Sequence, residues 1–378
     1  MDLSLSDLQR DVQETVRRFV DERILPHAVA NDQAHRLDRG VIEGMADLGL
    51  LGVVVPEAYG GAGLDFVTEA LVCEEIERGE AAFRTLISVH VGLNSLRRAA
   101  TSEPASGISY AAVADHALVF AKTDPAAGHR GISAFVVELD APGVEARTTE
   151  AKLGVWAGNT GELFFTGCEV PAEHRLGEEG QGFEIAMAGL DQGRFTVAAG
   201  AVGVVRACLE RSLAYANERR AFGQPIGRNQ FVQDLIFDMV EGYETSKLLV
   251  MQAAWLKDQG RRSSRETSLA KVHATEAAFR AAQAAVRIHG AAGYAAEVGV
   301  ERYLRNATAP IIYEGTTQIH KMLQAEHALG YRAVNGRRGE MSPLVAWQPG
   351  RPQDRNGALA PPAPAEVTQP VDARPLAG

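Results

Sequence analysis

The sequence predicts an α+β protein that is mostly α, because its apolar residues change period twice along the chain. From Leu3 to Arg98 they recur every three or four positions, as on one face of a helix. Between Ala117 and Glu169 they form short runs bounded by turn residues, as in strands, and the helical period then returns until about Leu329. The expected order is a helical domain at 1–98, a β-domain at 99–181, a helical bundle at 182–333 and a tail at 334–378.

The first predicted helix carries its apolar residues on one face, at Leu8, Val12, Val16 and Phe19. Pro26 stands where this helix should end, because proline cannot donate the hydrogen bond that would continue it. Farther along, the glycines of segment 59–64 predict an irregular loop before the helical spacing resumes.

Three short apolar runs predict the strands of the β-domain, at 117–121, 132–139 and 161–165. Asp124-Pro125 and segment 140–143 separate these runs as turns, since proline, glycine and aspartate favour the backbone of turns. A small β-domain is therefore expected between the two helical regions.

Long stretches of helical spacing fill the region after Gly182 and predict a bundle. From Asn229 onward the apolar residues form a broad stripe, at Val232, Leu235, Ile236, Met239, Val240 and Tyr243. The alanine-rich segment 264–290 suits close packing between helices. Eight of the 16 prolines lie past Ser342, so the tail from residue 334 is predicted to be disordered.

Composition excludes several classes of function. The chain has 378 residues, 38 Lys+Arg against 48 Asp+Glu and a pI near 5.6, which argues against a nucleic-acid-binding protein. The longest apolar run, around Leu48 to Val55, is too short to cross a bilayer. Asp2, Asp7 and Asp11 stand where a signal peptide would be basic and then apolar. We therefore expect a cytoplasmic protein without membrane insertion.

The three cysteines, Cys73, Cys168 and Cys208, are widely spaced and form no C-x-x-C motif. This spacing offers no disulfide framework and no zinc or other metal site. We interpret all three as packing residues.

Four segments occur along these regions at characteristic places: Val53–Gly61 (VVVPEAYGG), Gly180–Phe183 (GQGF), Arg219–Gly223 (RRAFG) and Tyr313–Ile319 (YEGTTQI). No one of them is decisive alone, but together, in this order and near this spacing, they resemble the acyl-CoA dehydrogenase family over nearly all of residues 1–333. The resemblance implies an N-terminal helical domain, a small antiparallel β-domain and a C-terminal four-helix bundle.

The resemblance also implies a catalytic residue. In the family a carboxylate takes the α-proton of an acyl-CoA thioester while flavin N5 takes the β-hydride, and Glu314 matches that carboxylate. A glutamate suits this task because an apolar pocket can raise its pKa toward that of the proton it removes. Gly315 behind it permits a tight turn. The alternative is that Glu314 only complements the dipole of the helix that follows.

Some family members place the base instead on the first long helix of the bundle, at the stretch that reads 189–194 here. The only acidic residue of that stretch is Asp191, so the loop position at Glu314 is expected to be the working one. By the same match the substrate is expected near Asp191, Arg194, Tyr313 and Gly315. For Arg194, a structural salt bridge at a helix end is the alternative to ligand contact.

The cofactor implied by the resemblance is FAD. The matched contact residues are Arg219, Phe222, Gln230, Arg287, Ile288, His289, Gly290, Ala291, Thr316, Gln318, Ile108 and Ser109. In the family several of these reach the FAD of a neighbouring subunit, which implies a homotetramer or a homodimer. His289 and Ala291 depart from the usual family residues, and for Arg219 the alternative is an exposed charge at a helix end.

An absence marks the β-domain. In the family a helix, the first strands and a loop of the type L-T-E-P-x-x-G-S-D precede a W-I-T or W-I-S motif, of which Ile108-Ser109 remains here without the Trp. Here Leu93–Arg98 leads within a few residues to Ile108-Ser109, so several dozen residues are missing. Segment 102–107 is a remnant either of the T-E-P loop or of the stretch before it. The β-domain is therefore predicted to be truncated on the side that covers the flavin.

Two functions follow as hypotheses. The first is an FAD-dependent acyl-CoA dehydrogenase that forms a 2-enoyl-CoA and passes electrons to an electron-transfer flavoprotein, with an oxidase or monooxygenase of the same fold as a variant. Its substrate is a CoA thioester or one held on an acyl carrier protein. The second, motivated by the missing segment, is a degenerate paralogue that serves as an oligomeric scaffold or binds acyl-CoA without redox chemistry.

Overall fold

The computed structural model describes residues 4–92, 96–97 and 105–330. For those within 89–107, this description covers the backbone alone. The predicted tail at 334–378 and the remnant residues 102–104 lie outside the described residues. The chain divides into two compact units, Met1–Met322 and Leu323–Gly378. In the second unit, the described residues comprise the last turns of one helix, up to residue 330. The predicted domain boundaries within the first unit stay a prediction.

The N-terminal region is helical, as predicted, and consists of α1 (Asp7–Phe19), α2 (Ala28–Gln33), α3 (Arg39–Asp47), α4 (Phe66–Gly79) and α5 (Ala81–Gly92). A capping box starts α1, because Ser6 accepts from the backbone of Gln9 while the Gln9 side chain accepts from that of Ser6. Pro26 lies in a 3-10 turn after the helix has loosened into a π-helical stretch, which confirms the predicted helix end.

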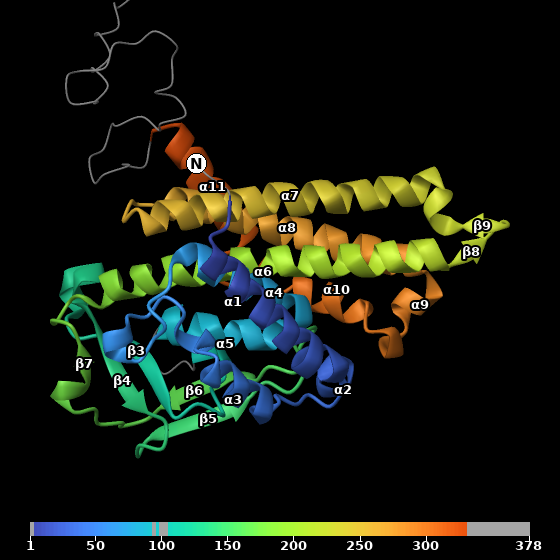
Figure 1. The fold of residues 1–378 in the computed structure, drawn as a ribbon. Coiled ribbons are helices and arrows are strands. Elements are labelled where there is room, and N and C mark those ends of the chain that lie inside the picture. Colours follow the sequence, from blue (N-terminus) through green and yellow to red (C-terminus); the bar gives the residue numbers. More distant parts are fainter. Residues whose placement is uncertain (1–3, 93–95, 98–104, 331–378) are drawn as a thin grey trace, which may run out of the picture. The chain divides into compact units, whose positions relative to one another are not determined.

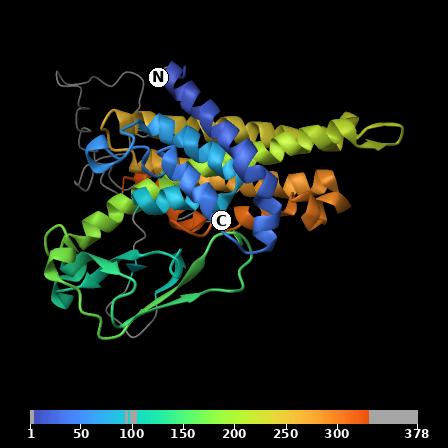
Figure 2. The same cartoon turned by 60° about the horizontal axis from the view of Figure 1, so that its bottom comes forward.

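In the described part of the β-domain, seven strands form two sheets: β1 (Leu96–Arg97), β2 (Ala105–Ser109), β3 (His116–Lys122), β4 (Ile132–Glu138), β5 (Val144–Thr148), β6 (Thr160–Phe165) and β7 (Arg175–Leu176). The predicted runs correspond to β3, β4 and β6. One sheet has the order β1-β3-β4-β7 and the other β2-β6-β5. Pairing is antiparallel as expected, except that β1 pairs with β3 in parallel. These strands lie together on one side of the helices (Figure 2).

Three long helices dominate the C-terminal region, α6 (Gly182–Glu218), α7 (Gln230–Asp258) and α8 (Ser264–His289). The hairpin of β8 (Arg220–Ala221) and β9 (Gln224–Pro225) connects the first two helices at one end (Figure 1). The shorter helices α9 (Ala291–Tyr294), α10 (Glu301–Ala307) and α11 (Thr317–Ala328) follow α8.

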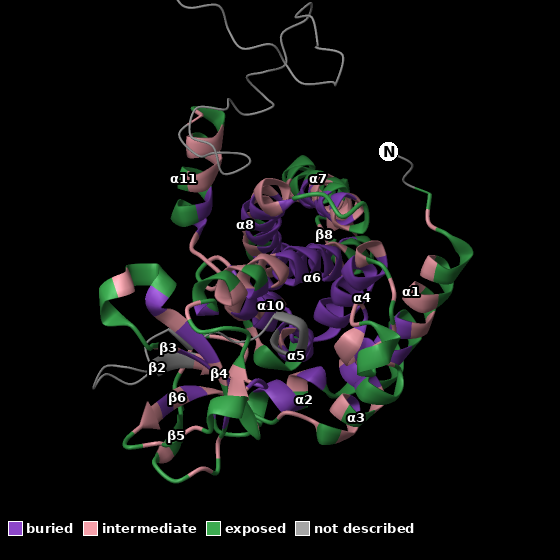
Figure 3. Ribbon diagram, turned by 90° about the vertical axis from the view of Figure 1, so that its left-hand side faces the viewer, coloured by how far each residue is buried: buried purple, intermediate pink, exposed green. Residues whose placement is uncertain are grey.

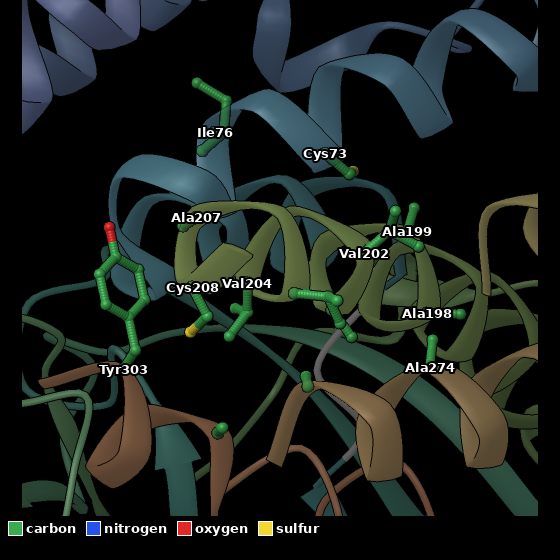
Figure 4. Packing of buried hydrophobic residues seen from close by; sticks show 14 of the residues in the cluster. Cys73, Ile76, Ala198, Ala199, Val202, Val204, Ala207, Cys208, Ala274 and Tyr303 are labelled. Atoms are coloured by element: carbon green, nitrogen blue, oxygen red, sulfur yellow. The ribbon is translucent and has the colours of Figure 1, made fainter. Parts of the chain in front are cut away.

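The core of the first unit surrounds α6. This helix contacts α4, α5, α7 and α8, and its residues from Phe195 to Cys208 are all buried (Figure 3). Small residues let the helices approach closely: a Cβ atom at Gly203 would lie 2.0 Å from the carbonyl oxygen of Glu74 on α4. Figure 4 shows Cys73 and Cys208 within this packing. Both are buried and Cys168 is half-buried, and all three are free thiols.

Among the described residues, none of the helices is long and apolar enough to span a membrane. The same part of the chain holds no group of three or more His, Cys, Asp or Glu side chains arranged to bind a metal ion. The expected cytoplasmic location stays a prediction.

Candidate active site

Glu314 lies on a tight turn between α10 and α11. Its φ is +55° and that of Gly315 is +94°, so two consecutive residues adopt the left-handed backbone region. Glycine accepts this conformation freely, whereas a residue with a side chain is strained there by about 1 kcal/mol or more. Such a turn persists only where its surroundings hold it.

Three donors from three helices hold the turn. The carbonyl oxygen of Glu314 accepts from Nε of Arg194 on α6 at 3.0 Å and from Nε2 of His320 on α11 at 3.1 Å. The carbonyl oxygen of Gly315 accepts from Nζ of Lys271 on α8 at 2.7 Å. Arg194 therefore has a role that neither alternative foresaw, because it fixes the backbone of the candidate base.

The carboxylate of Glu314 occupies space that a glycine leaves open on α6. A Cβ atom at Gly193 would lie 2.6 Å from Oε1 of Glu314, closer than such atoms approach. The other oxygen, Oε2, is buried and accepts no hydrogen bond within the described residues. A buried oxygen without a partner is costly unless a ligand or water satisfies it. Gly193 was missed in the sequence, although it stands in the stretch that carries the base in some family members.

Replacing Gly193 by alanine tests whether this space positions the carboxylate. The added methyl group must push Glu314 aside, so turnover should fall about 100-fold, as a displacement near 1 Å commonly produces. Steady-state kinetics measure kcat in the variant and in Gly40→Ala on α3, where a Cβ atom would have no neighbour closer than 3.4 Å. Equal turnover in the Gly193→Ala variant and the wild type would show that the carboxylate does not need this space.

Burial raises the pKa of Glu314, while the positive charges of Arg194, Arg84 and Lys271 oppose that rise. Arg84, on α5, is itself fully buried. Its Nη2 donates to the hydroxyl of Tyr313 at 2.8 Å and its Nε pairs with Oε2 of Glu77 on α4. A buried ion pair therefore adjoins the candidate base, and sequence reasoning found neither Glu77 nor Arg84.

His320 is buried beneath the turn. Its Nδ1 accepts from the hydroxyl of Ser268 at 2.8 Å, because Nε2 carries the proton that is donated to Glu314. Burial lowers the pKa of His320 to about 4, helped by the charges of Lys271 and Arg194. The ring thus stays neutral in the folded protein at neutral pH.

The depressed pKa of His320 predicts a loss of stability in acid. Between pH 6.5 and 4 the unfolded chain binds a proton that the folded chain does not, so stability falls by about 3 kcal/mol as the pH drops through this window. Urea unfolding of the His320→Gln variant at both ends of the window should show a smaller fall than the wild type. His129→Gln, at an exposed histidine of the β-domain, is the control for the exchange of histidine for glutamine. An unchanged slope in His320→Gln would contradict the assignment.

The remaining residues that were predicted to contact the substrate or the flavin differ in burial and in hydrogen-bond partners. Asp191 pairs with Lys257 of α7 at 3.2 Å. Thr316 is half-buried and its hydroxyl accepts from the backbone of Ile319 at 3.4 Å, whereas Gln318 is exposed. Ile108 and Ser109 end β2, which pairs with β6.

A second group of predicted flavin contacts lies at the opposite end of α6. Gly193 and Arg219 are 26 residues apart along one helix, which corresponds to about 39 Å at 1.5 Å per residue. At this far end the exposed members are Arg219, Phe222, Gln230, Arg287, Gly290 and Ala291. The side chains of Ile288 and His289 are buried, and the His289 ring stacks on Tyr215 with ring centres 4.3 Å apart. In this structure the side chains of Ile288 and His289 are therefore not accessible to a ligand.

The comparison with known families decides the assignment. Models of the acyl-CoA dehydrogenase N-terminal, middle and C-terminal domains match residues 6–105, 106–168 and 180–329. The chain belongs to the acyl-CoA dehydrogenase family. Members of this family are oxidoreductases that use FAD, and solved relatives include complexes with FAD and with FADH2. Enzyme class and cofactor of the chain follow from this membership.

Individual relatives agree with this assignment. An acyl-CoA dehydrogenase of Bacillus subtilis is 37% identical over 368 residues, covering 84% of this chain and 97% of the relative. A glutaryl-CoA dehydrogenase of Desulfococcus multivorans is 36% identical over 389 residues, covering 89% and 100%. Among solved structures, a glutaryl-CoA dehydrogenase with glutaryl-CoA has a TM-score of 0.85 at 35% identity, covering 90% and 100%. A structure described as the electron transferring flavoprotein of Acidaminococcus fermentans has a TM-score of 0.83 at 32% identity, covering 86% and 99%.

The alignment with the acyl-CoA dehydrogenase of B. subtilis also measures what is missing. It runs over 368 positions but uses 84% of the 378 residues, about 318, so about 50 positions have no residue of this chain. The location of these positions before Ile108 stays a prediction.

Groups suited to bind FAD lie at the end of the long helices that carries the β8–β9 hairpin. The β8–β9 hairpin projects beyond the long helices (Figure 1), and Phe222 at its tip is 97% exposed. Arg219 and Arg287 are exposed at the same end, and guanidinium groups suit a diphosphate. Oε2 of Glu314, which has no partner among the described residues, lies beside Gly193, and Gly193 is about 39 Å along α6 from Arg219.

Proposed function

We propose that this chain catalyses the α,β-dehydrogenation of an acyl-CoA thioester to a 2-enoyl-CoA, with Glu314 as the base. The observation that carries the proposal is the Glu314 carboxylate itself. It occupies the space left by Gly193, its Oε2 is buried without a partner among the described residues, and three donors hold its turn. FAD, when bound, supplies the acceptor for the hydride from Cβ.

The surroundings of Glu314 suit the removal of a proton. The charges of Arg194, Arg84 and Lys271 favour the ionised carboxylate before the reaction. Burial favours the protonated form, so the side chain can keep the proton that it takes from Cα. Tyr313, Gly315, Asp191 and Arg194 are the proposed neighbours of the thioester.

We further propose that the FAD-binding site forms between two copies of the chain. One copy provides Arg219, Phe222, Gln230, Arg287, Ile288, His289, Gly290 and Ala291. Of these, Ile288 and His289 contribute through their backbone, because their side chains are buried. The other copy provides Thr316, Gln318, Ile108 and Ser109. Large apolar side chains near the first group support an interface with a second copy: Phe222 is 97%, Phe231 90% and Tyr294 85% exposed. A homodimer is the minimum and a homotetramer the proposed assembly.

The buried Arg84 favours a narrower substrate class, a thioester with a second carboxylate at the far end of its acyl chain. Three of the five guanidinium N–H groups donate, to Glu77, Ser88 and Tyr313, which leaves two for a substrate carboxylate beside the base. Two relatives reported above are glutaryl-CoA dehydrogenases. A higher kcat/KM for glutaryl-CoA than for butyryl-CoA is the expected result, and the reverse order would contradict this narrower class.

The electron acceptor is proposed to be an electron-transfer flavoprotein, which the similarity to the A. fermentans structure supports. Two alternative functions predict other outcomes. Turnover without an added electron acceptor would indicate an oxidase. Reaction with only the carrier-bound thioester would indicate a substrate held on an acyl carrier protein. The non-redox scaffold predicts thioester binding that Glu314→Gln leaves unchanged and no reduction of any acceptor.

Exchange of the α-proton tests the role of Glu314 directly. The protein, with FAD added, is incubated with an acyl-CoA in D₂O, and deuterium at Cα is measured by mass spectrometry. Exchange by the wild type and its loss in Glu314→Gln are expected, because the amide cannot accept a proton. Equal exchange by both proteins would remove Glu314 from the mechanism.

A further inference from the structure

We propose that Lys271 is a positioning residue for Glu314. Its ammonium group holds the Glu314–Gly315 turn through the carbonyl oxygen of Gly315, and its charge helps to keep the carboxylate ionised before the reaction. This role rests on the proposed function of Glu314 as the base. Lys271 lies on α8, outside the Tyr313–Ile319 motif that identified Glu314.

The burial of Lys271 is the first observation. Its side chain is fully buried, yet it forms no ion pair within the part of the chain that the structure describes. Burial of a charge without an opposite charge is costly, so an apolar residue would be the stable choice at a position that only packs. The one bond recorded from Nζ goes to the carbonyl oxygen of Gly315 at 2.7 Å.

The geometry of the turn is the second observation. Arg194 and His320 both donate to the carbonyl of Glu314, whereas Lys271, on α8, donates to that of Gly315. The backbone of Glu314 is strained, and the two carbonyls that accept these bonds belong to Glu314 and to the glycine that follows it. Without Lys271, the end of the turn loses its tie to α8, and the carboxylate is free to move away from Gly193.

The charges around Lys271 determine the direction of its effect. Glu314 and Glu276 raise its pKa and Arg194 lowers it, but burial dominates and lowers the pKa to about 8. His320, which also faces Lys271, stays neutral above about pH 4. At pH 7 Lys271 therefore carries a charge, which lowers the pKa of Glu314 against the effect of burial.

Replacing Lys271 by methionine removes both the donor and the charge at similar side-chain length. We expect kcat to fall about 100-fold with KM within a few-fold, because the base is displaced while the substrate still binds. The acidic limb of the pH profile of kcat/KM should move to higher pH, because the pKa of Glu314 rises. Lys271→Arg keeps a charge and a donor and should return that limb to its wild-type place.

Lys247 provides the matched control. It is a largely buried lysine on α7 that pairs with Glu74 of α4 at 3.2 Å and has no contact with the turn. Lys247→Met also removes an ammonium group from between two helices and should lower stability. It should leave the acidic limb where it is in the wild type. Movement of the limb in both variants would overturn the proposal, because the effect would then be a general loss of packing.

A second readout does not depend on turnover. Infrared difference spectra identify the protonated carboxyl stretch of Glu314 as the band that Glu314→Gln lacks, and its intensity against pH reports the titration. The midpoint should rise in Lys271→Met and stay in Lys247→Met. An unchanged midpoint and an unchanged kcat in Lys271→Met would overturn the proposal for Lys271 while Glu314 remains the base. Full activity of Glu314→Gln would instead overturn the proposed function, whatever the band does.

Discussion

Glu314→Gln is expected to lower turnover by about 10²- to 10⁴-fold, the range that a positioned general base contributes. The amide has the shape of the carboxylate but cannot accept the α-proton, so the affinity for the thioester should change only a few-fold. Oε2 of Glu314 is the atom expected to take the proton, since it is buried without a partner. Stopped-flow reduction of the flavin by an acyl-CoA measures the rate, and titration measures the affinity.

Glu210→Gln is the control for this prediction. Glu210 also lies in the helical region and pairs with Arg206, but its side chain is 46% exposed and far along α6 from Gly193. Its replacement should leave the rate of flavin reduction unchanged. Undiminished reduction by Glu314→Gln would show that another group takes the proton.

Arg84→Met is expected to lower the free energy of unfolding by about 3–5 kcal/mol, because it leaves the buried carboxylate of Glu77 without its partner. The pKa of Glu77 is already raised by burial, and Arg84 is the first of the groups that oppose this rise. A cavity also opens beside Tyr313, whose hydroxyl loses its donor. Urea unfolding monitored by circular dichroism measures the loss.

The double variant Glu77→Gln, Arg84→Met should recover part of that stability, since no uncompensated charge then remains. The exposed pair of Arg147 and Glu145 on the β-domain gives the comparison, because both side chains are 59% exposed. Arg147→Met should lower the free energy of unfolding far less than Arg84→Met, because exposed ion pairs contribute little. Similar losses in Arg84→Met and Arg147→Met would show that the buried pair does not stabilise the fold.

Much of the fold could be predicted because local spacing determines it. The apolar stripes and turn residues indicated the long helices and the strands β3, β4 and β6. The parallel pairing of β1 with β3 had no local signal, since two residues of strand cannot be recognised by alternation.

The candidate site was only half visible in the sequence. A motif identified Glu314, whereas Glu77, Arg84 and Lys271 resemble the charges of an exposed helix face. In α4 every residue from Thr68 to Gly79 is buried, including four glutamates, because these accept from side chains of other helices. Most of these partners are distant in sequence, and even Arg84 lies on the next helix, so the pattern of one helix does not reveal them. The burial of Ile288 and His289 was missed for the same reason.

The anaerobic visible spectrum of the purified protein, after incubation with FAD and gel filtration, tests the central claim most directly. The account predicts a flavin band in stoichiometric amount that bleaches when an acyl-CoA is added. A folded protein that retains no flavin, or whose flavin band stays unchanged with every acyl-CoA, would contradict it.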